Sequence, residues 1–307
     1  MTPLTAPSVV LTHESDLDGL LSGLLLVRLA RARFGTEVPL QAWNYQGWRN
    51  RQMSDRVAWV SDFTFEPRLD RPGWLVVDHH AFEGRPTQAR LIHDPAQSAA
   101  GLVYGLCREA GLASPVLDRL VHLNNLSDLW RNQDPEFDLA TDYAGLVKDY
   151  GFWNLHHLIA GDPERLLDHP LLEVMAVRRR VENPIGYDWC ARHVEAVAPG
   201  VGVVHTSVGD SNLIVHQLLD RAATPHSVLI TLFPKANRTV VASIRSLRGE
   251  ALGVAAQLQG GGHPNAAGAT LPRSVTDVAS AVEYLRECLH PHGRDADLLM
   301  RSGQLHL

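Results

Sequence analysis

The stretch that decides the fold is Trp74-Leu75-Val76-Val77-Asp78-His79-His80, in which four apolar residues lead directly into one carboxylate and two imidazoles. A short apolar run after a glycine, here Gly73, is typical of a buried parallel strand. Ligands of open α/β sheets bind at the carboxyl ends of the strands, so Asp78, His79 and His80 are expected at a ligand site. Carboxylates and imidazoles together bind first-row metals, although the same triplet alone could be a hydrogen-bonded strand end.

Two further apolar runs end in the same way. Residues 9–12 are followed by His13-Glu14-Ser15-Asp16-Leu17-Asp18-Gly19, and residues 57–60 are followed by Ser61-Asp62. Helix caps and turns explain single residues of this kind. They explain poorly why three strands in succession end in His or Asp, so the set favours a metal site at one edge of a sheet.

A glycine-rich segment lies near the C-terminus, Gly260-Gly261-Gly262-His263-Pro264-Asn265-Ala266-Ala267-Gly268. Together with the segment 13–19, Asp62 and Asp78-His79-His80, in that order, it resembles the DHH phosphoesterase family with its DHHA1 companion domain. DHH paired with GGGH is much more specific than either motif alone. The resemblance implies an α/β fold: a parallel-sheet DHH domain with flanking helices, a smaller α/β DHHA1 domain and a cleft between them.

Length and charge agree with two domains and a small substrate. The chain has 307 residues, 45% of them hydrophobic, and a net charge of 28 − 34 = −6. Two globular domains fit this length, and the acidic balance argues against coating long nucleic acid. A short oligonucleotide or nucleotide held by metals is therefore the expected partner, no long-duplex binding is expected, and a homodimer remains open.

The expected location is the cytoplasm, without a membrane partner. The three cysteines, Cys107, Cys190 and Cys288, are far apart, which suggests a reducing compartment. The first residues lack the basic and apolar regions of a signal peptide. No apolar run approaches the length that spans a bilayer.

Alternating apolar runs and helical patterns predict a parallel sheet covered by helices in the first part of the chain. Strands are expected at 9–12, 38–43, 57–60, 74–77 and 89–93, and helices at 18–34, 97–111 and 115–130. New strands at 201–205, 227–233 and 239–244, with helices at 212–222 and 250–258, indicate a second domain. We place the DHH domain at 1–190, with a helical linker at about 171–195, and the DHHA1 domain at 196–307.

Carried over by motif, the resemblance implies two divalent metals that share a bridging Asp62. Mixed carboxylate and imidazole ligands favour Mn²⁺, with Mg²⁺ or Co²⁺ as alternatives. Asp128 is the best match to a family Asp on a helical segment, with Asp134, Asp138 and Asp142 as rivals. One metal would be held by His13, Asp16 and Asp62, and the other by Asp18, Asp62, His79 and Asp128.

The resemblance also implies catalytic and substrate-binding residues. Arg245 ends a predicted strand with a planar guanidinium suited to phosphate. A glycine run lets the backbone approach an anion closely, although such runs are more often flexible turns. Asp78 and His80 would orient His79 and the phosphate. The catalytic set is Asp78, His79, His80 and His263, and the substrate-binding set is Arg245, Gly261, Gly262, His263 and Asn265.

The function implied is hydrolysis of short oligonucleotides by a nanoRNase-like exonuclease, through a hydroxide activated by two metals. A cyclic-dinucleotide phosphodiesterase or a pAp phosphatase is the alternative. The leading His13 is similar to these branches, whereas RecJ-type exonucleases have Asp there; its spacing to Asp16 is one residue shorter than the usual nanoRNase form. A RecJ-like exonuclease is less favoured because there is no room for an extra oligonucleotide-binding domain. The GGGH segment counts against a family II pyrophosphatase, and the full ligand set counts against a non-catalytic nucleotide-binding module.

Overall fold

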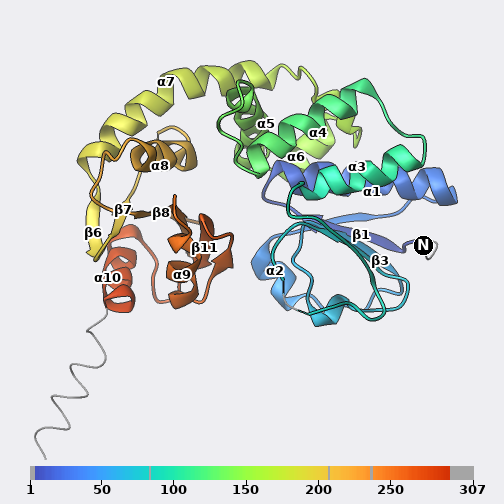
Figure 1. Ribbon diagram of the computed structural model, residues 1–307, viewed down its shortest axis with the longest axis horizontal. Coiled ribbons are helices and arrows are strands. Elements are labelled where there is room, and N and C mark those ends of the chain that lie inside the picture. Colours follow the sequence, from blue (N-terminus) through green and yellow to red (C-terminus); the bar gives the residue numbers. More distant parts are fainter. Residues whose placement is uncertain (1–3, 83, 207, 236–237, 291–307) are drawn as a thin grey trace, which may run out of the picture. The chain divides into compact units, whose positions relative to one another are not determined.

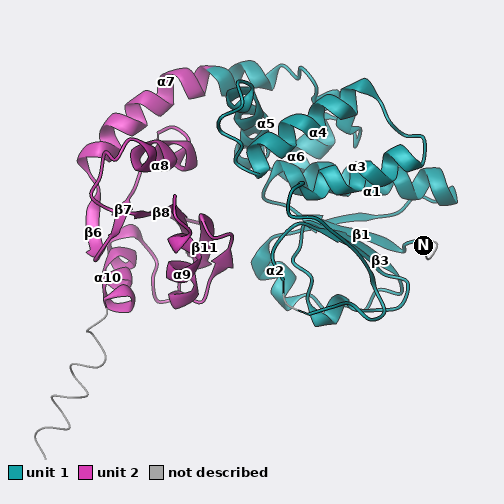
Figure 2. Cartoon of the chain, viewed as in Figure 1, with its two compact units in different colours: residues 1–176 teal, residues 177–307 magenta. Residues whose placement is uncertain are grey.

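The computed structural model describes residues 4–82, 84–206, 208–235 and 238–290, which fold into two compact units (Figure 2). The first unit ends at Ala176 and the second begins at Val177. This division falls inside helix α7 (Leu171–Arg192), and the boundary placed at 190–196 from the sequence lies at the other end of the same helix. In the part of the chain that is described, no helix combines the length and the apolar character needed to cross a membrane.

The first unit is built on a five-stranded sheet in which every pairing is parallel, as predicted. The strand order is β2-β1-β3-β4-β5, so the chain leaves β1 for one edge and then returns to its other side. Ligands of such sheets bind where the order reverses, outside the carboxyl ends of the strands. The strands are β1 (Val9–His13), β2 (Leu40–Trp43), β3 (Ala58–Ser61), β4 (Leu75–Asp78) and β5 (Arg90–His93).

Helices cover both faces of this sheet because its central strands are apolar on both faces. Val10 of β1 packs with Leu25 of α1 on one face, where α1 and α3 lie (Figure 1). Leu11 packs on the other face with Trp48 of α2. The helices are α1 (Leu17–Phe34), α2 (Tyr45–Asn50), α3 (Ala99–Glu109), α4 (Pro115–Asp128), α5 (Phe137–Tyr150) and α6 (Phe152–Leu158), with short 3₁₀ turns at Pro67–Leu69 and Pro163–Leu166.

The start of α1 sits directly against the end of β1. Asp16 caps the helix, its carboxylate accepting a hydrogen bond of 2.9 Å from the Gly19 backbone N–H. A Cβ atom at Gly19 would lie 2.1 Å from the His13 carbonyl oxygen, so only glycine permits this close approach. The helix ends at Gly35, whose φ of 66° is left-handed, as its sequence position predicts.

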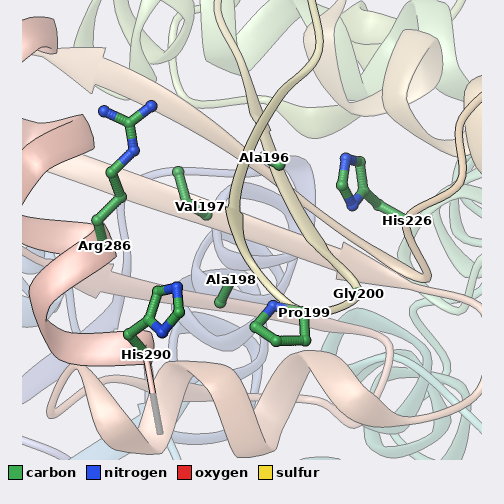
Figure 3. A pocket seen from close by; sticks show the side chains of 8 residues that line it. All are labelled: Ala196, Val197, Ala198, Pro199, Gly200, His226, Arg286 and His290. Carbon is green, nitrogen blue, oxygen red and sulfur yellow. The ribbon is translucent and has the colours of Figure 1, made fainter. Parts of the chain in front are cut away.

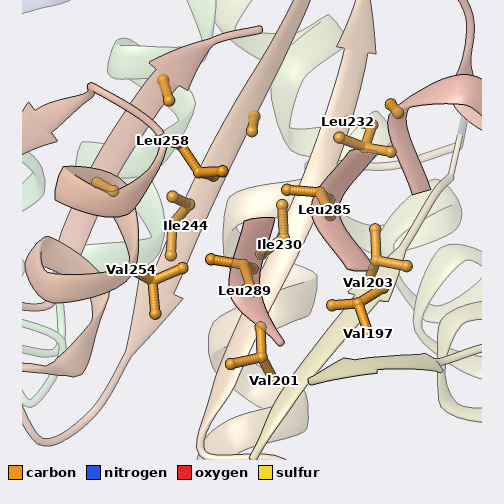
Figure 4. Packing of buried hydrophobic residues seen from close by; sticks show 14 of the residues in the cluster. Val197, Val201, Val203, Ile230, Leu232, Ile244, Val254, Leu258, Leu285 and Leu289 are labelled. Carbon is orange, nitrogen blue, oxygen red and sulfur yellow. The ribbon is translucent and has the colours of Figure 1, made fainter. Parts of the chain in front are cut away.

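The second unit contains a mixed six-stranded sheet of order β10-β11-β9-β8-β7-β6, in which the pair β7–β8 is parallel and the others are antiparallel. Its core joins strand residues such as Ile230 and Ile244 to Val254 and Leu285 on helices (Figure 4). The elements are β6 (Glu195–Ala198), β7 (Val201–Val204), α8 (Ser211–Asp220), β8 (Val228–Pro234), β9 (Val240–Ser246), α9 (Glu250–Gln257), β10 (Gly261–Gly262), β11 (Ala266–Thr270) and α10 (Val278–Leu289).

Candidate metal centre

The ends of three neighbouring strands bring the predicted ligands of the first unit together. Leu11, Val60 and Val76 lie side by side in the register of β1, β3 and β4. Two residues further along each strand stand His13, Asp62 and Asp78. Parallel strands in register end at the same edge of the sheet, so these polar side chains emerge at one level.

The first group consists of His13, Asp16 and Asp62. The Nδ1 atom of His13 lies 2.8 Å from Oδ2 of Asp16 and 3.6 Å from Oδ2 of Asp62. Nε2 of His13 and Oδ2 of Asp62 are buried and make no hydrogen bond within the described part of the chain. Each residue offers one potential ligand atom, and these three atoms lie within 4.8 Å of one another. A single ion could therefore bind all three.

The second group gathers around His79. Its Nε2 atom lies 3.5 Å from Oδ2 of Asp128, 3.8 Å from Oδ1 of Asp62 and 3.9 Å from Oδ2 of Asp18. Asp62 therefore turns one carboxylate oxygen toward His79 and the other toward His13. This is the geometry expected of a carboxylate that bridges two ions.

Asp18 is held in place by backbone and side-chain donors from two later helices. Its Oδ2 accepts a hydrogen bond of 2.8 Å from Ala99 N–H, and its Oδ1 accepts one of 2.8 Å from Ala100 N–H, both in the first turn of α3. The Asn124 side chain donates to Oδ1 as well, at 2.7 Å, and to the Ser98 hydroxyl at 2.9 Å. Sequence reasoning did not identify Asn124, because an Asn inside an amphipathic helix carries no signal for a partner 106 residues away.

Asp78 and His80 form a pair beside these groups. The fully buried Asp78 accepts from the His80 backbone N–H at 3.1 Å and lies 2.7 Å from His80 Nδ1. Burial opposes protonation of His80, but the hydrogen bond and the charge of Asp78 outweigh it and raise the His80 pKa. The His80 carbonyl lies 2.8 Å from Nε2 of His93, which fixes this turn further. Asp78 thus orients His80.

The carboxylates make the site strongly unfavourable for negative charge. Desolvation, followed by the charges of Asp16 and Asp18, raises the pKa of Asp62 well above its ordinary value. Desolvation and the charges of Asp18 and Asp16 do the same to Asp128. Asp16 is the exception, because His13 and the Gly19 N–H outweigh desolvation and lower its pKa. Clustered carboxylates of this kind need compensating cations to ionise together.

The donor set fits divalent metal ions. It offers carboxylate oxygens and imidazole nitrogens without a thiolate, which suits Mn²⁺ and similar ions. Oδ2 of Asp128, like Oδ2 of Asp62, is buried without a hydrogen-bond partner in the described residues. Buried polar atoms normally have a partner, so both oxygens are suited to bind an ion. The position of Asp128 at the last residue of α4 agrees with the expectation of a helical Asp.

The predicted phosphate-binding residues of the second unit lie around one hairpin. Gly261 and Gly262 form β10 and pair with Gly268 and Ala267 of β11, so the glycine segment is a strand and turn. Arg245 of β9 stands opposite Ala266 in the register. Its guanidinium donates to the carbonyl oxygens of Ile244 at 3.0 Å and Ala267 at 3.4 Å.

Burial lowers the pKa of Arg245 to about 10, against the opposing charge of Asp210. Part of the hydrogen-bonding capacity of the Asn265 side chain is used within the second unit, because its Oδ1 accepts a hydrogen bond of 2.6 Å from the Gly249 N–H. The His263 backbone N–H donates to the Ala266 carbonyl at 2.9 Å, closing the turn. The phosphate-binding role of these residues stays a prediction.

Comparisons with known proteins agree with this architecture. Residues 200–290 match the DHHA1 domain family. The structure of a pGpG-specific phosphodiesterase, PggH from Vibrio cholerae, is similar over 92% of this chain and 99% of that chain, with 13% sequence identity and a TM-score of 0.50. The second unit therefore carries a DHHA1 domain.

The Mn²⁺ complex of RecJ from Thermus thermophilus is similar in fold over 91% of this chain and 51% of that chain, with 19% identity and a TM-score of 0.51. The chain therefore spans about half the length of that RecJ. A search of curated protein sequences gives no match.

Two other features of the chain fall outside the centre. Asp134, a rival of Asp128, lies with His122 and Glu136 in a more exposed group. A shallow pocket of the second unit is lined by residues of β6 and of the turn that follows it, together with His226, Arg286 and His290 (Figure 3). It contains none of the predicted substrate-binding residues.

Proposed function

We propose that this chain is a DHH phosphoesterase with a DHHA1 domain, a metal-dependent phosphodiesterase that hydrolyses short oligonucleotides, with a nanoRNase-like action on dinucleotides and slightly longer chains. The observation that carries the proposal is the position of Asp62 between two groups of ligands, with one oxygen directed to His13 and the other to His79. A single-metal or purely structural site would not require a carboxylate placed in this way.

In this proposal the first ion is held by His13, Asp16 and Asp62, and the second by Asp18, Asp62, His79 and Asp128. Two such cations would supply a hydroxide nucleophile near neutral pH and neutralise charge on the phosphate oxygens. Hydrogen bonds from Ala99, Ala100 and Asn124 hold the Asp18 carboxylate in position. The second ion would therefore bind a ligand that needs no reorganisation.

The chain's own residues would contribute orientation and positive charge. Asp78 keeps a proton on Nδ1 of His80 and raises the pKa of that imidazole, which favours a cationic His80 beside an anionic phosphate. In the second unit, the Arg245 guanidinium would bind a substrate phosphate, with Gly261, Gly262, His263 and Asn265 supplying further contacts.

The net charge supports a short substrate, because an acidic chain disfavours long polyanions. The similarity to a pGpG-specific phosphodiesterase supports a dinucleotide in particular, and keeps a phosphodiesterase of linear or cyclic dinucleotides as the second candidate.

A substrate panel tests the proposal. Purified protein with Mn²⁺ is offered dinucleotides and longer oligomers of RNA and DNA, pAp, cyclic dinucleotides and pyrophosphate. We expect fastest hydrolysis of the dinucleotides, a loss of at least about 100-fold in the Asp62→Asn variant and full activity in Asp138→Asn, which changes an exposed carboxylate of the same unit. Hydrolysis of pyrophosphate alone, or turnover by Asp62→Asn equal to wild type, would overturn it.

A further inference from the structure

Tyr45 is an exposed aromatic side chain beside the candidate metal centre. It is the first residue of α2, and 47% of its surface is exposed. Its ring centroid lies 4.8 Å from that of His13, a candidate ligand, with 53° between the planes. Large aromatic residues gain free energy by burial, so a half-exposed ring at this place has a surface that a ligand could cover.

The ring is held by a rigid aromatic base. Its centroid lies 5.9 Å from that of Phe63 in an edge-on contact at 88°. Phe63 in turn stacks on Trp48, with centroids 3.8 Å apart and planes 2° from parallel. The Trp48 indole N–H donates to Glu66 at 2.9 Å, which anchors the stack. A ring supported in this way loses little conformational entropy when a ligand covers it.

The backbone at Tyr45 is fixed by the residue before it. The Asn44 side chain accepts from Gly47 N–H at 2.8 Å, which caps α2, and donates to Glu14 at 2.9 Å. Glu14 directly follows β1, so this bond ties α2 to the strand that carries His13. The position of the Tyr45 ring relative to the metal centre is therefore preorganised.

The chemistry of the ring points to a neutral, flat ligand. A tyrosine phenol is uncharged near neutral pH, and nearly half of the residue is exposed. A neutral aromatic face does not attract a phosphate, but it stacks with any nucleobase. A base next to a phosphate bound at the candidate metal centre would reach the Tyr45 ring beside His13.

We infer that Tyr45 stacks on a nucleobase of the substrate and thereby favours nucleotide phosphodiesters over substrates that contain phosphate alone. This inference rests on the proposed function and adds to it a recognition site for the base. Tyr45 acts here in binding and takes no part in proton transfer.

The test compares Tyr45→Leu and Tyr45→Phe on an RNA dinucleotide and on the same dinucleotide without bases. Tyr45→Leu should lower kcat/KM for the dinucleotide by roughly 5- to 150-fold, mainly through KM, because stacking of one base is worth about 1–3 kcal/mol and each 1.4 kcal/mol is tenfold. Tyr45→Phe keeps the ring and should stay within about twofold of wild type. The abasic substrate should be hydrolysed equally by all three proteins.

Trp153→Leu is the matched control, since Trp153 is also 47% exposed but lies on α6. It should leave kcat/KM unchanged on both substrates. Mn²⁺ binding, measured by calorimetry, should be the same in every variant.

Four results would overturn the inference. An equal loss on both substrates, or weaker Mn²⁺ binding in Tyr45→Leu, would show that the ring only supports His13. A Tyr45→Phe variant as impaired as Tyr45→Leu would show that the hydroxyl makes the contact. If wild-type protein hydrolyses neither substrate, the proposed function fails, and calorimetric binding of the dinucleotide to wild type and Tyr45→Leu still decides the inference: equal affinities contradict it.

Discussion

Asp62 is the residue on which most of the site depends. Its φ of 58° is left-handed, a conformation that costs most L-residues about 1–2 kcal/mol but that Asp and Asn adopt more readily. The backbone turn directs the carboxylate between His13 and His79. Replacement by Asn therefore changes the charge while keeping the turn, whereas Ala would change both.

We predict that Asp62→Asn folds normally and loses both metals together. A bridging carboxylate serves two ions, so Mn²⁺ stoichiometry should fall from two toward zero, and kcat should fall at least about 100-fold because both ions act on the same phosphate. Metal analysis beside circular dichroism checks this. Loss of one ion only would assign the bridge to another residue, and Asp138→Asn serves as the control with unchanged metal content.

His216 of α8, in the second unit, leads to a prediction about how folding stability depends on pH. Burial, assisted by the charge of Arg245, lowers its pKa to about 4. The unfolded chain, with a His pKa near 6.5, binds more protons than the folded one between pH 6.5 and 4. Stability contributed by the neutral His216 is therefore complete above about pH 6.5 and is lost as the pH falls toward 4.

His216→Gln should accordingly make the unfolding of the second unit less sensitive to acid. The loss of stability between pH 7 and 4.5 should be smaller in the variant by roughly 1–3 kcal/mol. Denaturant unfolding at both pH values measures it, with His226→Gln as the control. An identical pH dependence of wild type and His216→Gln would contradict the assignment.

The elements that sequence reasoning found are those whose stability is local or fully buried. The apolar runs of β1, β3 and β4 are buried on both faces, so they stand out without knowledge of their neighbours. The polar residues that follow them, including Asp62, mark the sheet edge where ligands gather. This part of the fold and the grouping of the candidate ligands could be predicted.

The elements that were missed depend on partners elsewhere in the chain. β11 (Ala266–Thr270) consists of small residues with little strand preference and is a strand because β9 pairs with it. β6 precedes the turn at Pro199, whereas the sequence predicts new strands only after it. α10 begins at a capping box of Asp277 and Ser280, a local signal that the sequence does contain. The contact of Asn124 with Asp18 joins distant segments and could not be predicted.

Helix α4 gives a prediction at this scale, because Asn124 links it to the metal centre. Asn124→Ala removes the hydrogen bonds to Asp18 and Ser98 in a fully buried place, so the first unit should lose about 1–3 kcal/mol of stability. Mn²⁺ affinity should fall at the group of Asp18 and His79 and stay unchanged at the group of His13. Denaturant unfolding and a metal titration test both effects.

Asn132→Ala, at an exposed position just after α4, is the control and should match wild type in both measurements. An Asn124→Ala protein that binds both metals as tightly as wild type would show that Asp18 needs no help from α4.

The chain as a whole has the residues to separate chemistry from substrate binding, since the candidate ligands lie in one unit and Arg245 in the other. Arg245→Ala should leave Mn²⁺ content unchanged and raise KM about 10-fold or more with a smaller change in kcat, as expected when a phosphate contact is similar in ground and transition states. Steady-state kinetics with metal analysis test this. Arg248→Ala, an exposed arginine of the same unit, should behave as wild type, and loss of metal in Arg245→Ala would contradict the prediction.

Substrate length is a second property of the whole chain. A net charge of −6 disfavours the binding of a long polyanion. The rate per chain end should therefore fall steeply as RNA lengthens from two to about ten nucleotides, the range of a small single-strand site. Gel analysis of defined oligomers measures the rate, and equal processing of long strands would point to a RecJ-like exonuclease.

The hydrogen bonds between the Asp18 carboxylate and the first turn of helix α3 have a consequence for how such a protein could lose its activity in evolution. A descendant that gave up catalysis could replace Asp128, whose buried Oδ2 meets no hydrogen-bond donor in the described residues, with little harm to the fold. It could not discard Asp18 without leaving the N–H groups of Ala99 and Ala100 unsatisfied. Inactive descendants would thus shed Asp128 early and keep Asp18 late. Among relatives of unknown activity, an aspartate at position 128 is then a better indicator of an active enzyme than an aspartate at position 18.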